Sequence, residues 1–308
     1  ALFFMFLLYR YQSPALRRKA KRDEGLTESY ERSALLLLFT MLPILFSSTV
    51  YNISSVLDDF LYSSIMTGLG SKTKQIVMEW GIFGEYHVLF NIPVALANAL
   101  SSSLIPALTM AVASHDRKKT LSQIRVSIRF TLLIAVPCSI GMAVLADPLS
   151  RMLFPGKNVQ LLIQLTRVGS FAVLLYSLST ITNAILQGLG HLNLPLYHSM
   201  VALVLHLLSL VLFLYAGLGI YGVVLSNIVF ALIMCFLNQR AIFRHTRFRI
   251  DLFRSLVMPM LSGLIMGGAA YVIYFVIHIV LPEGLRKGRV GSALSLLPAV
   301  FIAILIYF

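Results

Sequence analysis

The stretch LFNIPVALANALSSSLIPALTM, Leu89 to Met110, decides the class of this protein. It is long and apolar enough to lie in a lipid bilayer, yet it contains two asparagines, three consecutive serines and two prolines. Hydrocarbon offers no hydrogen-bond partner, so polar side chains at that depth must face other protein groups or water. The stretch therefore predicts a membrane helix with one polar face.

The composition predicts an all-α polytopic membrane protein. Of 308 residues, 58% are hydrophobic and 12% are charged, whereas an ordinary soluble domain has about 25% charged residues. Several segments exceed the roughly 20 apolar residues that cross a bilayer, and the connections are too short for an extramembrane domain. We expect spanning helices at about 34–57, 81–112, 123–146, 158–188, 195–216, 219–239, 253–280 and 291–308, with a partial one at 1–9.

The two ends of the chain indicate a fragment. The opening ALFFMFLLYRYQSPALRRKAKR is apolar first and basic second, the reverse of a signal peptide. The chain does not begin with Met, and the last predicted span stops at Phe308 without a polar residue after it. We therefore expect both ends to be cut from a longer protein.

Basic residues alternate between the two sides of the predicted spans. The loops 10–33, 114–129 and 239–254 hold seven, five and five Lys and Arg residues, and the opposite connections hold two, two and three. The positive-inside rule places the first set in the cytoplasm. The net charge of +13 is then a sign of topology, and we expect no nucleic-acid partner.

Two neighbouring predicted helices each carry a polar stripe. At 100° per residue the members of each stripe fall within about 80° of the helix circumference. The first stripe comprises His87, Asn91, Asn98, Ser102 and Thr109, and the second comprises Thr40, Ser47, Tyr51, Ser55 and Asp58.

The stripes have two interpretations. Serine and threonine suit close helix packing as well as they suit a wet cavity. Asn91, Asn98, His87 and Asp58 are costlier to bury, which favours a water-filled cavity lined by both stripes. Pro93 and Pro106 each remove an intrahelical hydrogen bond, which favours kinks in a helix that bends around such a cavity.

The span 158–188 does not fit a single stripe. Three polar side chains share one face near its start, and three others share nearly the opposite face near its end. The helix is either broken between them, or its halves face different neighbours. The first group is Gln160, Gln164 and Arg167, and the second is Thr180, Asn183 and Gln187.

Charged residues inside or beside the spans are candidates for binding roles. Arg125 and Arg129 are placed to attract an anionic headgroup, although snorkelling positive-inside anchors explain them more simply. Asp58 and its neighbour Asp59 either bind a coupling cation or proton, or only mark the outer end of a helix. The histidines and the two cysteines do not fall at ligand spacing, so we expect no metal and no cofactor.

Four motifs resemble a known family. In chain order they are GEYHVLFNIPVALANALSSSLIPALTMAVA, AVPCSIGMAVLADPLSRMLFPG, ITNAILQGLGHLNLPLYHSM and GIYGVVLSNIVFALIMCFLN. Their order and spacing resemble polysaccharide and lipid-linked oligosaccharide flippases of the multidrug/oligosaccharidyl-lipid/polysaccharide exporter superfamily, nearest to the stage V sporulation protein B branch.

That resemblance implies a transporter with two six-helix lobes and two extra C-terminal helices. Residues 1–33 would be the end of a preceding helix and a basic inter-lobe linker. Residues 34–240 would be the C-terminal lobe, and 241–308 the two extra helices. The N-terminal lobe would be missing from this chain, and it would be a partner of the part that is present.

The resemblance also implies a function without enzymatic activity. Family members flip a polyprenyl-diphosphate-linked oligosaccharide or peptidoglycan precursor across the bacterial cytoplasmic membrane by alternating access, so membrane lipid and that substrate are the implied partners. Related flippases hold sodium with carboxylates and amides on helices seven, eleven and twelve. Asp58 and Asn227 match that pattern, whereas the predicted helix 195–216 has no acidic residue, which argues against an intact sodium site.

Two alternative functions remain. One is a cation-coupled multidrug exporter of the same superfamily, whose cavity walls would be acidic and aromatic. The other is a membrane-embedded glycosyltransferase or acyltransferase, which would need catalytic carboxylates or a histidine in a sizeable extramembrane segment. The predicted connections do not offer such a segment.

Overall fold

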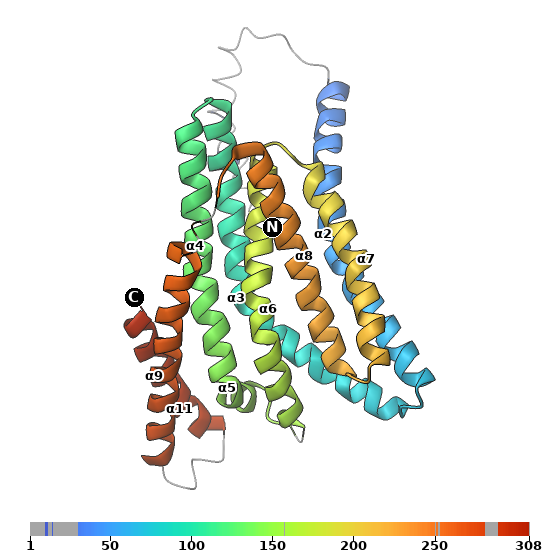
Figure 1. Ribbon diagram of the computed structural model, residues 1–308, viewed down its shortest axis with the longest axis vertical. Helices are drawn as coiled ribbons and strands as arrows, with labels where there is room; N and C mark the ends of the chain where they lie inside the picture. The colour runs from blue at the N-terminus through green and yellow to red at the C-terminus, as the bar shows by residue number, and fades with distance from the viewer. Residues whose placement is uncertain are drawn as a thin grey trace. The chain divides into compact units, whose positions relative to one another are not determined.

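A computed structural model describes residues 10, 11, 14, 30–156, 158–249, 251, 253–280 and 289–307. Within these ranges the regular elements are helices (Figure 1). The chain divides into two units, one ending at Leu42 and the other beginning at Pro43. The geometry below concerns the second unit unless stated otherwise. The predicted partial helix 1–9 and nearly all of the predicted linker 10–33 lie outside the described residues.

The helices follow the predicted spans in order. They are α2 Tyr30–Gly68, α3 Thr73–Ala113, α4 Arg117–Val144, α5 Ala146–Leu153, α6 Val159–Gly188, α7 Asn193–Tyr215, α8 Ile220–Thr246, α9 Met258–Val280 after a π-helical segment Phe253–Val257, and α11 Arg289–Tyr307. Seven helices in the described part of the chain are long and apolar enough to cross a membrane. The all-α membrane fold is therefore confirmed.

The structure differs from the prediction in three places. α2 extends to Gly68 and not to 57, so Asp58 lies inside the helix. α5 is a short helix that the hydropathy pattern did not indicate, and it begins directly after α4. The apolar part of α11, Gly291–Tyr307, is shorter than the seven long spans and contains Pro298.

α6 is the centre of the packing. Its buried residues, from Leu162 to Gly188, lie on all sides of the helix, as is typical of a helix enclosed by others. α3, α4 and α8 pack against it. The Ser139 hydroxyl of α4 donates to the Ser170 carbonyl at 2.8 Å, and the Cys235 thiol of α8 donates to the Leu175 carbonyl at 3.2 Å. Both cysteines are free.

The remaining helices pack outside this core. α7 packs on α8, while α9 packs on α4 and α11. The loops 114–129 and 239–254, which the charge pattern places on one side of the membrane, come together at one end of the unit. Arg129 Nη2 lies 3.8 Å from Asp251 Oδ2, and the α3–α4 and α8–α9 connections share that end (Figure 1).

Gly169 sets the distance between α3 and α6. The Tyr86 hydroxyl of α3 donates to the Gly169 carbonyl at 3.3 Å. A Cβ atom on Gly169 would fall inside the van der Waals envelope of the Tyr86 ring, which is buried and has little room to move.

We expect Gly169→Ala to lower the free energy of unfolding by about 1–3 kcal/mol, because overpacking forces the Tyr86 ring or the α6 backbone to shift. Gly268→Ala is the matched control, since a Cβ at this helical glycine meets open space. Thermal unfolding in detergent measures both variants. Equal midpoints for the two would contradict the assigned role of Gly169.

Candidate functional site

A polar cavity of about 590 Å³ lies between α2, α3, α6 and α8. Its polar lining comes mainly from hydroxyl and amide side chains. These are Ser47, Ser48, Asn52, Ser54, Ser55, Asp58, His87, Asn91, Asn98, Ser101, Ser102, Tyr176, Thr180, Asn183, Gln187 and Asn227. We call this space the polar cavity.

The α3 wall holds most of the first predicted stripe. The Asn91 amide donates to His87 Nδ1 at 3.0 Å, and the Ser102 hydroxyl donates to the Asn98 carbonyl at 3.0 Å. The Asn98 side chain has no hydrogen bond to another residue in the described part of the chain. Thr109 does not line the cavity. Its hydroxyl donates to the Ile105 carbonyl at 2.9 Å and lies 3.4 Å from the Gly188 carbonyl of α6. α3 changes direction along its length, as the two prolines favour (Figure 1).

The α2 wall holds part of the second predicted stripe. Ser47, Ser55 and Asp58 line the cavity, and so do residues that the stripe did not include, such as Asn52. The Asn52 amide donates to the Ser48 carbonyl at 3.1 Å, so the helix backbone satisfies it. Thr40 lies in the other unit, where its hydroxyl donates to the Leu36 carbonyl at 2.6 Å. The side chain of Tyr51 is outside the described residues.

α6 contributes the third wall, and polar groups in both of its halves contact α8. The helix is continuous from Val159 to Gly188. Thr180, Asn183 and Gln187 line the polar cavity, whereas Gln164 accepts a hydrogen bond from the Tyr221 hydroxyl of α8. The sequence placed these polar groups on opposite faces, but it did not show which face met the cavity.

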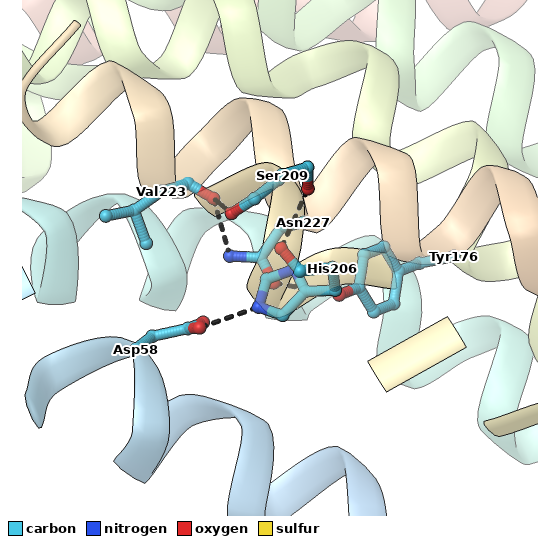
Figure 2. Close-up of polar contacts among 7 residues, drawn as sticks. Asp58, Tyr176, His206, Ser209, Val223 and Asn227 are labelled. Atoms are coloured by element: carbon cyan, nitrogen blue, oxygen red, sulfur yellow. Dashed lines mark hydrogen bonds and ion pairs between the residues drawn. The ribbon is translucent and has the colours of Figure 1, made fainter. Parts of the chain in front are cut away.

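Asp58 is paired with a residue that the sequence analysis did not select. His206 Nε2 on α7 lies 2.6 Å from Asp58 Oδ1, and both side chains are buried (Figure 2). Asp58 therefore does not mark a helix end. The signal that could have found His206 is its place as a histidine inside an apolar span, which requires a polar partner.

Asn227 on α8 lies beside this pair. Its Oδ1 accepts from the Tyr176 hydroxyl at 3.2 Å, and its Nδ2 donates to the Val223 carbonyl at 3.0 Å (Figure 2). The pair and Asn227 thus bring α2, α6, α7 and α8 together at one point of the cavity wall.

A second polar network joins α6, α7 and α8. His198 of α7 donates from Nδ1 to Asn238 Oδ1 at 2.7 Å. The Asn238 amide donates to Asn183 Oδ1 at 2.7 Å and to Thr182 Oγ1 at 3.1 Å. These bonds join α6, α7 and α8 without a charged group, which suits packing at bilayer depth.

Arg125 and Arg129 lie away from the polar cavity. Arg129 approaches Asp251 at 3.8 Å, and its Nε donates to the Ser255 hydroxyl at 3.4 Å. Arg125 is exposed on the same helix. Neither side chain lines the cavity.

A second cavity of about 460 Å³ is apolar and lies between α3, α4, α5, α9 and α11. Its walls include Ile92, Pro137, Met266 and Ile304. α3 forms a wall of both cavities, with its polar face toward one and its apolar face toward the other.

No group of three His, Cys, Asp or Glu residues in the described ranges is placed to hold a metal ion. Two histidines do meet, because the rings of His191 and His245 have centroids 3.9 Å apart. His191 lies in the α6–α7 connection, where burial and the neighbouring His245 lower its pKa.

A bundle of long apolar helices around a polar cavity defines a membrane transporter. Solved structures of two membrane transporters share this fold. The lipid II flippase MurJ in its inward closed conformation matches with a TM-score of 0.63, at 15% identity over 92% of this chain and 55% of that chain. An outward-facing multidrug-resistance MATE family transporter matches with a TM-score of 0.58, at 17% identity over 86% of this chain and 66% of that chain.

The chain belongs to the lipid II flippase MurJ family, whose model matches residues 5–286. This family consists of transporters and not of enzymes. Two relatives are the probable lipid II flippase MurJ of Bdellovibrio bacteriovorus, 24% identical over 226 residues, and the uncharacterized membrane protein YabM of Bacillus subtilis, 25% identical over 176 residues. These matches cover 71% and 57% of this chain but only 42% and 32% of the relatives.

We expect water to reach Asn98. In a variant without native cysteines, Asn98→Cys should react with a water-soluble maleimide on the order of tenfold faster than Phe236→Cys, because a thiol in hydrocarbon does not ionise. Phe236 is an exposed apolar residue of α8 outside both cavities. Mass spectrometry measures the labelling, and equal rates would contradict a hydrated cavity.

Proposed function

We propose that this protein flips a polyprenyl-diphosphate-linked oligosaccharide or peptidoglycan precursor across the cytoplasmic membrane of a bacterium. The observation that carries the proposal is the polar cavity, whose lining consists largely of neutral amides and hydroxyls at bilayer depth. Membership of the lipid II flippase family supports it.

The lining suits a saccharide. Sugar hydroxyls both donate and accept hydrogen bonds, and Asn and Gln side chains offer both kinds of group. Three of the six serines that line the walls, Ser48, Ser101 and Ser102, already donate to their own helix, so their oxygens remain as acceptors. The free amide of Asn98 is the strongest single candidate for a contact with sugar.

The apolar cavity suits the lipid tail. Its lining resembles hydrocarbon, so a polyprenyl chain would lose no hydrogen bond on entering it. Because α3 separates the two cavities, one substrate would place its sugar on one side of α3 and its tail on the other. Arg125 is the better candidate for attracting the diphosphate, since Arg129 is already bonded to Asp251 and Ser255.

We propose that residues 34–240 form one lobe of a two-lobed transporter, with 241–308 as additional helices and 10–33 as a cytoplasmic linker. The polar cavity would face the other lobe of the complete protein, and rocking of the lobes would expose it to either side. Within the family we place the chain nearest to the stage V sporulation protein B branch.

The alternative, cation-coupled multidrug export, has less support from the cavity. Asp58 is the one carboxylate among the described lining residues, and it is already hydrogen-bonded to His206. A lipophilic cation would therefore find little free negative charge there.

Replacing Asn91 and Asn98 together with Leu should lower flipping about tenfold or more, since each lost hydrogen bond contributes about 1 kcal/mol. The amount of protein in the membrane should stay the same, because both side chains face the cavity. The measurement is translocation of a lipid-linked saccharide in proteoliposomes that contain the complete protein.

The matched control is the double variant Asn91→Ser with Asn98→Ser, which keeps polar groups at both positions and should retain most of the activity. Normal flipping by the leucine variant would remove the reason for treating this wall as the substrate site.

A further inference from the structure

The contact between Asp58 and His206 joins α2 and α7. Asp58 lies on α2 and His206 on α7, and Oδ1 and Nε2 are 2.6 Å apart. The exposed fraction is 3% for the Asp58 side chain and 0% for the His206 side chain. Figure 2 shows the carboxylate and the imidazole directed at each other across the space between the two helices.

Apolar and neutral groups surround the imidazole. The ring of Phe230 on α8 meets it edge-on, with centroids 6.0 Å apart, and the Ser209 hydroxyl bonds to the His206 backbone carbonyl and not to the ring. His206 Nδ1 is buried and has no hydrogen-bond partner within the described residues. The ring can therefore accept a proton at Nδ1 without losing a bond.

The other ionisable groups of this region are few. Among the described lining residues of the polar cavity, those that can gain or lose a proton are Asp58, the Tyr176 hydroxyl of α6 and His87 of α3. Tyr176 bonds to Asn227, and His87 bonds to Asn91. Asp59, next to Asp58, is exposed, and α8 presents Asn227 and Phe230. No second charge in this set balances Asp58.

The number of protons on the pair therefore sets its charge. A neutral imidazole that donates from Nε2 to the Asp58 carboxylate leaves one uncompensated negative charge away from water. A second ring proton, at Nδ1, gives an imidazolium–carboxylate pair with no net charge. An unpaired buried charge costs more than one unpaired N–H group, and the pair carries no net charge only when the second ring proton is present.

The same geometry disfavours a metal cation. Hard cations select oxygen ligands. Here Asp58 Oδ1 is bonded to the imidazole and Asn227 Oδ1 to the Tyr176 hydroxyl, so both oxygens already have donors. Within the described residues a cation would have only Oδ2 of Asp58 as a charged oxygen without a donor, whereas a proton needs only Nδ1.

We propose that Asp58 and His206 form a proton-binding site that holds α2 against α7 when protonated and releases α2 when the proton is lost. The pair exchanges its proton with water in the polar cavity, which Asp58 lines. The remaining carboxylate then gains hydration by separating from α7. The inference rests on the proposed function only in that this wall bounds the proposed substrate cavity.

The test measures the separation of the two helices as a function of pH. Spin labels at Phe60→Cys on α2 and Leu208→Cys on α7, both exposed positions, report the distance by pulsed electron resonance in a variant without native cysteines. The complete protein is studied in lipid nanodiscs without substrate. A population with a longer distance should appear as the pH rises. The ratio of this population to the one with the shorter distance should change by up to about tenfold per pH unit for one proton.

The double variant Asp58→Asn with His206→Gln keeps a hydrogen-bonding pair but removes both ionisable groups, so its distances should not depend on pH. His198→Gln, a buried histidine on the same helix, and His87→Gln, in the same cavity, should keep the native pH response. These controls separate the pair from the other histidines nearby.

Three results would overturn the proposal. They are native distances that do not change with pH, a pH response that survives in the double variant, and a shift caused by sodium at constant pH. The first result is measured on the protein with its native Asp58 and His206, so it can overturn the proposal even if the double variant misfolds. The distance measurement requires no transport. A negative result in it therefore does not affect the flipping assay of the asparagine variants, and a negative flipping assay does not affect the distance measurement.

Discussion

Every polar group in this protein that lies at bilayer depth must find its partner within the protein or in enclosed water, because lipid supplies none. The chain meets this constraint in three ways. Hydroxyls such as Ser101 bond to their own helix, at 2.8 Å from the Ala97 carbonyl. Asn238 joins three helices through neutral bonds. Asn98 faces the polar cavity instead. The third solution leaves both donors and acceptors for a ligand.

The constraint also acts on α2. Large apolar side chains along it, including Phe46, Val56 and Phe60, are exposed, whereas Tyr62 is buried in the apolar core and stacks on Trp80 of α3. Within the described residues, polar contacts join α2 to its neighbours at Asp58 with His206 and at Tyr62 with Glu79 of α3. Of these two contacts, the one with His206 lies at the polar cavity.

The sequence predicted the helices well because hydropathy and length decide them, and the stripe arithmetic placed His87, Asn91 and Asn98 on one face. It could not predict two features. α2 continues beyond 57 because Asp58 finds a partner 148 residues away along the chain, which no local pattern contains. The sequence pattern placed the polar groups of α6 on two faces. Which helix each face contacts depends on how four helices pack together, and the periodicity of one helix does not specify that.

The Asp58–His206 pair also shows which features family resemblance does not predict. The resemblance predicts oxygen ligands on three helices, with Asp58 and Asn227 as candidates for two of them. On the third helix, α7, the side chain that contacts Asp58 is the imidazole of His206, which offers a nitrogen base. Fold and cavity follow from helix packing and tolerate such a change. The species that binds at this point depends on one side chain, so family membership alone does not determine the coupling chemistry.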